Sequence, residues 1–216
     1  MIEINFKIIL EIISNIKNFH KEIRKLIDIS KEDRKHAIYL LQGGALSYLI
    51  YAYDFNNEGY IVPLAQQYRM ILETIELILF FNELDDGSRY IKAFFKGHTI
   101  RIKQGNSGNP DIEDRIKISG LTEERLNRSD DLYKNLFNIG SDYMHPNLES
   151  IRAKLINGSY IFDYERKFIS KPYKSAIDFN KLFLIPVIHG FLLPINTIPF
   201  NELDYSALKY FLEKHK

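Results

Sequence analysis

The sequence contains no cysteine. This absence excludes a disulfide scaffold, a thiolate metal site, a cysteine nucleophile and a thiol redox switch. An excess of either charge is also missing, because 29 Lys and Arg residues against 28 Asp and Glu residues leave a formal charge of +1. This balance argues against a strongly basic nucleic-acid coat or an acidic tail, but it is compatible with one local basic patch. The chain does contain 45% hydrophobic residues, which is enough for a folded globular core.

The common cofactor and catalytic motifs are missing as well. No P-loop, dinucleotide-binding fingerprint, kinase motif set, nucleophile elbow or zinc signature occurs in the sequence. We therefore expect no cofactor and no resident metal. A function has to be sought in clusters of His, Arg, Asp and Glu side chains.

We also expect neither a signal peptide nor a membrane span. Residues 1–19 mix charged residues into their apolar ones and lack a basic leader and a small-residue cleavage site. Residues 182–200 carry no formal charge and match a membrane span in length. However, Pro186, Pro194 and Pro199 would each remove a backbone donor. We predict that this run is a kinked helix in the core, and that the protein is cytoplasmic with no membrane partner.

Apolar residues at spacings of three and four predict helices over most of the chain. The first, over residues 3–28, is long and amphipathic, and Ser30 with Asp33 resembles a capping pair at the start of the second. We expect these two helices to form an antiparallel hairpin, with a close crossing at Gly43 and Gly44. Further helices are expected over residues 63–84, 88–104, 122–145, 147–156, 174–193 and 204–214.

Residues 158–170 interrupt this helical pattern. Their sequence, GSYIFDYERKFIS, is rich in aromatic and β-branched residues, which favours a short β-hairpin. No internal repeat and no long linker occurs elsewhere. The sequence therefore predicts an all-α fold, a multi-helix bundle built on the long N-terminal hairpin, as a single domain over residues 1–216.

The helix predicted at residues 63–84 carries a polar stripe on an otherwise apolar surface. Its members follow at spacings of three, four and three, which places them on one face: Gln66, Arg69, Glu73 and Glu76. The stripe is compatible with a solvent-facing edge, with a buried ion-pair network that sets helix register, or with a functional cleft. The residues alone leave these three interpretations open.

A second cluster, SDYMHP at residues 141–146, ends the helix predicted from residue 122. At this position the helix dipole favours a protonated His145, which can exchange a proton near neutral pH and is oriented by the following proline. The alternative is a structural histidine that bonds a neighbouring carbonyl or carboxylate. Asp142 precedes His145 by three residues, and di-metal helical bundles use two such pairs of a carboxylate and a histidine to bind their metals. Only one such pair is present here, so we predict no metal site.

A third cluster is a basic run along the helix predicted at residues 88–104. It consists of Arg89, Lys92, Lys96, Arg101 and Lys103. Stripes of this kind contact phosphates in nucleic-acid-binding proteins. They are equally typical of a solvated helix face, and both interpretations stay open.

Two of these segments together resemble a known family. They are YRMILETIELILFF, with Arg69 and Glu73, and SDYMHPNLES, with His145 before a proline. Over residues 35–156 the chain resembles the HEPN-like helical proteins of bacteria, particularly uncharacterised and phage-defence members. In HEPN ribonucleases an Arg and a His, separated by four to six residues, carry out metal-independent cleavage at a dimer cleft. Here Asn138 stands seven residues before His145, so Arg69 is the candidate for the cation.

The resemblance implies a HEPN-like protein of a prokaryotic defence or toxin–antitoxin system that binds RNA or a protein partner such as an antitoxin. If it is catalytic, it would cleave RNA without a metal, with His145 as general acid or base and Arg69 on the phosphate. Glu73 and Asp142 would stand beside them. Broad apolar faces on the first helix and on residues 182–200 also indicate a homodimer. The alternative is a non-catalytic helical interaction module, in which these residues are structural.

Overall fold

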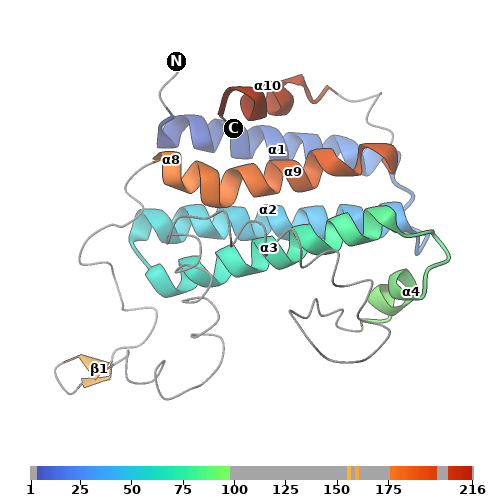
Figure 1. Ribbon diagram of the computed structural model, residues 1–216, viewed down its shortest axis with the longest axis horizontal. Coiled ribbons are helices and arrows are strands. Elements are labelled where there is room, and N and C mark those ends of the chain that lie inside the picture. Colours follow the sequence, from blue (N-terminus) through green and yellow to red (C-terminus); the bar gives the residue numbers. More distant parts are fainter. Residues whose placement is uncertain (1–3, 98–154, 157–158, 161–175, 199–203, 216) are drawn as a thin grey trace.

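The computed structural model describes residues 4–97, 155–156, 159–160, 176–198 and 204–215. Long helices lie alongside one another and make up most of this part of the chain (Figure 1). In chain order the elements are α1 (Phe6–Leu26), α2 (Arg34–Glu58), α3 (Ile61–Glu83), α4 (Arg89–Phe95), β1 (Leu155–Ile156), β2 (Ser159–Tyr160), α8 (Ala176–Phe179), η3 (Asn180–Leu184), α9 (Ile185–Leu192), η4 (Leu193–Asn196) and α10 (Ser206–His215). The predicted all-α fold is confirmed.

The first helix, α1, begins and faces the core as its sequence predicts. The Asn5 side chain caps it by accepting a hydrogen bond from the Ile8 backbone N at 3.0 Å. The apolar side chains at helical spacing are buried: Ile9, Ile12, Ile13, Ile16, Phe19 and Ile23. The chain itself covers this face, so the face gives no argument for a second subunit, and the homodimer stays a prediction.

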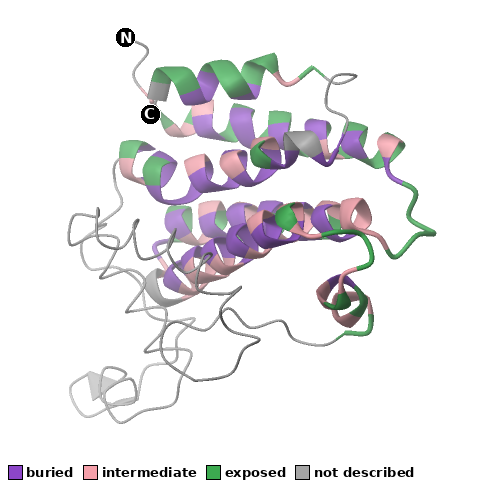
Figure 2. Ribbon diagram, turned by 45° about the vertical axis from the view of Figure 1, so that its right-hand side comes forward, coloured by how far each residue is buried: buried purple, intermediate pink, exposed green. Residues whose placement is uncertain are grey.

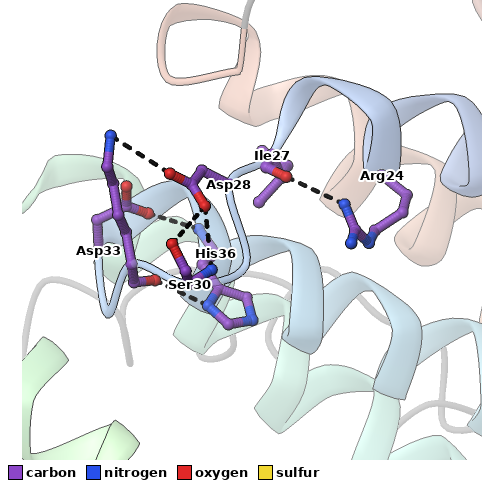
Figure 3. Close-up of polar contacts among 7 residues, drawn as sticks. Arg24, Ile27, Asp28, Ser30, Asp33 and His36 are labelled. Atoms are coloured by element: carbon purple, nitrogen blue, oxygen red, sulfur yellow. Dashed lines mark hydrogen bonds and ion pairs between the residues drawn. The ribbon is translucent and has the colours of Figure 1, made fainter.

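The start of α2 differs from the predicted Ser30 and Asp33 pair. Asp33 alone is the N-cap, and its side chain accepts a hydrogen bond from the His36 backbone N at 2.9 Å. The Ser30 hydroxyl instead donates to Asp28 at 2.7 Å within the preceding turn (Figure 3). At its other end α2 stops at Gly59, whose φ of 80° lies in the left-handed region that glycine adopts readily.

The predicted N-terminal hairpin is present. Its two helices run antiparallel, because Phe6 lies 6.2 Å from Tyr53 between ring centroids while His20 stacks on Tyr39 at 4.3 Å. Gly43 contacts α1, because an added Cβ there would lie 3.1 Å from His20 Cε1, whereas an added Cβ at Gly44 would meet only Tyr48 of α2 itself. The most extensive helix pair in the described part of the chain is α2 with α3, and α9 packs on both of them.

The C-terminal apolar run is a kinked helix in the core, as predicted. It passes from α8 through the π-helical turn η3 into α9. Pro186 accounts for the wider turn, because it has no N–H for the Leu182 carbonyl and its ring crowds that carbonyl. The side chains that fill the core are Phe179, Leu182, Phe183, Leu184, Val187, Ile188 and Phe191. Of the described helices, none is long and apolar enough to cross a membrane, and residues 199–200 lie outside the described part.

A buried glutamine ties α2 to the end of α9. Gln42 is fully buried, and its Nε2 atom donates to the Gly190 carbonyl at 3.2 Å and to the Phe191 carbonyl at 3.4 Å. Pro194 creates the need for this donor, because a proline four residues after Gly190 supplies no N–H for its carbonyl. A side chain of α2 thus replaces the helical hydrogen bond that the proline removes.

Two predicted helices differ from the observed elements. The short helix α4 stops at Phe95 and does not continue to residue 104, since Gly97 adopts a φ of 76° and donates its N–H to the Phe94 carbonyl at 3.0 Å. Residues 155–156, expected at the end of a helix, form β1, which pairs antiparallel with β2. Only β2 lies within the segment 158–170 that is expected to form a hairpin, and residues 161–170 lie outside the described residues. The single domain stays a prediction, because residues 98–154 and 161–175 lie outside the described residues.

Candidate nucleic-acid interface

The short helix α4 stands apart from the long helices, at one end of the bundle (Figure 1). Aromatic side chains hold it there. The Tyr90 ring packs edge-on against Phe80 with centroids 5.0 Å apart, and Phe94 packs edge-on against Phe81 at 5.4 Å. Ile91 is fully buried. One side of α4 therefore packs on α3 and α2, and its other side faces solvent.

The solvent side of α4 carries the predicted basic residues. Figure 2 shows exposed positions on α4. Arg89 and Lys92 of this helix and Lys96, its C-cap, are exposed, and their spacing places them on one face. The Arg89 guanidinium lies 5.1 Å from the centroid of the Tyr90 ring. Lys92 and Lys96 make no ion pair with any residue that the structure describes. The remaining predicted members of the run, Arg101 and Lys103, lie outside the described residues.

Two acidic residues in the neighbouring turns, Asp86 and Asp28, are already engaged. Asp86, in the turn before α4, accepts a hydrogen bond from the Arg34 backbone N at 3.3 Å and lies 3.7 Å from Arg34 Nε. Arg34 also donates from Nη1 to a main-chain carbonyl at the end of α3, at 2.6 Å. In the turn before α2, Asp28 bonds Ser30 and Lys31, and hydrogen bonds from Ser30 lower the pKa of Asp28 (Figure 3). These contacts do not use the lysines of α4.

His36 links the start of α2 to α4. Its Nδ1 atom lies 2.8 Å from the Lys31 carbonyl oxygen. A carbonyl only accepts hydrogen bonds, so Nδ1 carries a hydrogen, and in the neutral form of the ring Nε2 is then an acceptor. On α4 the Phe95 ring lies 5.1 Å from the His36 ring, tilted by 45°. Both side chains are half-buried, and the pair borders the basic face of α4.

The polar stripe of α3 is largely covered. Arg69 Nε donates to Glu73 Oε1 at 2.7 Å, and the two side chains are 19% and 41% exposed. Glu76 is buried, with 7% exposure. The interpretation of the stripe as a solvent-facing edge is therefore wrong for Arg69 and Glu76. A structural ion pair and a site that needs Arg69 both remain compatible with this geometry.

The predicted catalytic residues fall into two groups. Arg69 and Glu73 are in direct contact, as described above. Asp142 and His145 lie outside the described residues, so their place in a site stays a prediction. Within the described ranges there is no group of three His, Asp or Glu side chains suited to holding a metal ion.

His20 stands next to Lys21 in the sequence, but the structure largely buries its side chain. Its Nε2 atom lies 3.0 Å from the Tyr39 carbonyl oxygen, and Phe191 contacts its ring edge-on at 5.8 Å. Burial lowers the pKa of His20 below the ordinary 6.5, against the opposing effect of the bond to the Tyr39 backbone. Ile16 and Ile23 flank it at spacings of four and three. That spacing is the signal that could have placed His20 on the core side of α1.

Similarity to known proteins adds nothing to these observations. Compared with known protein families, characterised proteins and solved structures, the chain shows no significant match. The functional evidence therefore consists of the basic face of α4, the His36 and Phe95 pair, and the Arg69 and Glu73 pair.

Proposed function

We propose that this chain is a HEPN-like protein of a prokaryotic defence or toxin–antitoxin system, and that it binds RNA through the basic face of α4. The family assignment rests on the resemblance over residues 35–156. The binding assignment rests on one observation. Lys92 and Lys96 are exposed on a helix whose opposite side is anchored to α3 by packed aromatic rings.

A basic face on an anchored helix suits phosphate binding for a physical reason. Ordering a flexible basic segment during binding costs conformational entropy, whereas the backbone of α4 is ordered beforehand. Because the whole chain carries a formal charge of only +1, attraction of RNA would be local to this face. Much of the binding free energy would come from counterion release, so the affinity should fall as the salt concentration rises.

Cleavage of the bound RNA is the catalytic form of this proposal. His145 would take the proton from a ribose 2′-hydroxyl, whose oxygen would attack the adjacent phosphorus to form a 2′,3′-cyclic phosphate. The bond from phosphorus to the 5′-oxygen would break, and the leaving 5′-oxygen would take a proton from water. Arg69 would stabilise the charge on the phosphate oxygens, with Asp142 nearby. Since Arg69 Nε bonds Glu73 at 2.7 Å, that carboxylate would set the orientation of the guanidinium.

A second candidate function is a non-catalytic interaction module. The observation that favours it is that the Arg69 side chain is only 19% exposed and already pairs with Glu73. A covered cation with its carboxylate on the same helix is explained by packing alone. In this case the helices would present a surface to a protein partner such as an antitoxin.

Fluorescence anisotropy with a labelled single-stranded RNA tests the binding proposal. The double variant Lys92→Ala/Lys96→Ala should weaken binding and reduce the salt slope of log K by about 1.4, since each contact to a single strand contributes about 0.7. The matched control is Lys17→Ala/Lys21→Ala, which removes two exposed lysines at the same spacing from α1. If both double variants lose the same binding affinity, the attraction is a general effect of charge. If Lys92→Ala/Lys96→Ala loses no affinity, the interface is rejected.

Incubation of RNA with the protein in EDTA tests the catalytic form. His145→Ala should abolish cleavage or growth inhibition and leave the fold intact. Arg69→Ala should do likewise, with some loss of stability because it leaves the Glu73 carboxylate without its partner. Unchanged activity in both variants would reject these site residues, and loss of stability without any activity in the parent would favour the interaction module.

A homodimer is the oligomeric state that we propose. The apolar faces of α1 and α9 are covered within the chain, so a dimer would have to use other surfaces. In the described part, the exposed large apolar residues are Leu10, Ile29, Leu40, Tyr51, Ile177, Leu193 and Tyr210. Light scattering that shows a monomer at high micromolar concentration would reject the dimer.

A further inference from the structure

His36 offers a hydrogen-bond acceptor beside the basic face of α4. The bond from Nδ1 to the Lys31 carbonyl, at 2.8 Å, sets the tautomer of the neutral ring, so that Nε2 carries a lone pair. Nε2 accepts no hydrogen bond from the residues drawn in Figure 3 or from the rest of the described chain. The imidazole is half-buried, which leaves part of it open to solvent.

Phe95 connects this acceptor to the lysines of α4. Its ring contacts the His36 ring at 5.1 Å between centroids. Lys92 precedes Phe95 by three residues and Lys96 follows it directly, so both lysines belong to the helical turn that touches the imidazole. One acceptor beside two cations matches the chemistry of a ribonucleotide strand, which offers negative phosphates and, between them, a 2′-hydroxyl that can donate.

We propose that His36 Nε2 accepts a hydrogen bond from a ribose 2′-hydroxyl when Lys92 and Lys96 contact the neighbouring phosphates. This contact makes the α4 face selective for RNA over DNA, because DNA offers the same phosphates without the hydroxyl. Lys31 and Phe95 are positioning residues, which hold the tautomer and the plane of the ring. The inference rests on the proposed binding of RNA by α4.

Binding of the full chain to RNA and DNA single strands of the same base sequence tests this inference. The parent protein should bind RNA about three- to tenfold more tightly, the range for one net hydrogen bond. His36→Phe keeps a ring against Phe95 but removes the acceptor, and should equalise the two affinities. His36→Asn keeps an amide N–H for the Lys31 carbonyl and also removes the acceptor at Nε2, and should equalise them too. His36→Gln can place an oxygen near the Nε2 position and should keep part of the preference.

The outcomes separate this inference from the proposed function. If the parent does not distinguish RNA from DNA, or if its preference survives both His36→Phe and His36→Asn, the 2′-hydroxyl contact is overturned. The lysine interface still stands in that case, provided that Lys92→Ala/Lys96→Ala weakens binding. Unchanged affinity in the lysine variant overturns the interface and this inference together. A general folding defect would lower binding to RNA and DNA alike, so the ratio of the two affinities is the quantity to measure.

Discussion

His20 and His36 make similar local contacts but lie in different surroundings. A ring nitrogen of each lies close to a main-chain carbonyl, of Tyr39 at 3.0 Å and of Lys31 at 2.8 Å, and each ring packs on an aromatic neighbour. His20 is enclosed by α1, α2 and α9, and burial lowers its pKa. Both side chains are half-buried, but the bond of His36 to Lys31 is exposed to solvent, whereas the bond of His20 to Tyr39 is partly buried. The helices that surround a histidine, more than its own bonding partners, therefore decide whether it can meet a ligand.

This contrast extends to the residues around each histidine. The closed junction consists of His20, Tyr39, Gln42, Gly43 and Phe191, where helices meet with little free space. The open junction consists of Lys31, His36, Lys92, Phe95 and Lys96. Substitutions in the closed junction should lower stability, and substitutions in the open junction should mainly lower binding.

Gln42→Ala should give the largest loss of stability. The substitution removes the donor for the Gly190 and Phe191 carbonyls and leaves a cavity beside α9. We expect the free energy of unfolding to fall by about 2–4 kcal/mol, because an unpaired buried carbonyl and lost packing act together. Urea titration followed by circular dichroism measures this change.

Pro194 provides the control for this prediction. Pro194→Ala restores a backbone N–H that can bond a carbonyl now served by Gln42. Gln42→Met, which keeps most of the volume, should therefore lower stability less in the Pro194→Ala background than in the parent, by about 1 kcal/mol. Equal losses in the two backgrounds would show that Gln42 does not compensate for the proline.

The adjacent glycines of α2 should respond differently to alanine. An added Cβ at Gly43 lies 3.1 Å from His20 Cε1, whereas at Gly44 its nearest neighbour is Tyr48 Cε2 at 4.0 Å. Alanine favours the helix by about 1 kcal/mol at both positions, but at Gly43 the His20 ring must move. Thermal unfolding should show Gly44→Ala to be more stable than Gly43→Ala by about 1 kcal/mol. Equal gains in stability from Gly43→Ala and Gly44→Ala would contradict the tight contact between Gly43 and His20.

The lowered pKa of His20 should make stability depend on pH. Below the ordinary pKa of 6.5 the unfolded chain takes up a proton that the folded chain resists, so the unfolded state holds more protons. The free energy of unfolding should therefore decline as the pH falls from 6.5 to the folded pKa, and then level off. His20→Phe should remove this part of the slope. Denaturant titrations at about pH 7.5 and about pH 5.5 measure the change in the free energy of unfolding between the two pH values. The same change in the parent and in His20→Phe would exclude His20 as the source of the pH dependence.

The helical frame could be predicted from sequence because its apolar residues repeat at helical spacing over long stretches. The repeat in α1 identifies both the helix and its buried face, and Pro186 indicates the kink in the C-terminal run. The repeat in α1 also includes His20 and that in α2 includes Gln42, but as polar residues neither is recognised from sequence as facing the core. The end of α4 depends on the backbone conformation of Gly97, which a glycine permits but does not require.

The candidate site could be predicted only in part. The exposure of Lys92 and Lys96 follows from the aromatic residues on the other side of α4. Because α3 is apolar nearly all round, no sequence pattern tells which side of Arg69 is covered. The role proposed for His36 depends on a ring from a distant helix, which no local pattern reports. Asp142 and His145 stay predictions.

His36→Ala should give the smallest loss of stability, in contrast to His20→Ala. It removes one hydrogen bond to Lys31 and the contact with Phe95, both at a half-exposed position. We expect the free energy of unfolding to fall by about 0.5–1 kcal/mol, whereas His20→Ala empties an enclosed position and should lower it by about 2–3 kcal/mol. Urea titration of both variants at a pH above 6.5, where His20 is neutral, makes the comparison. Equal losses would mean that α4 depends on His36 for its position, and the open junction would then be as structural as the closed one.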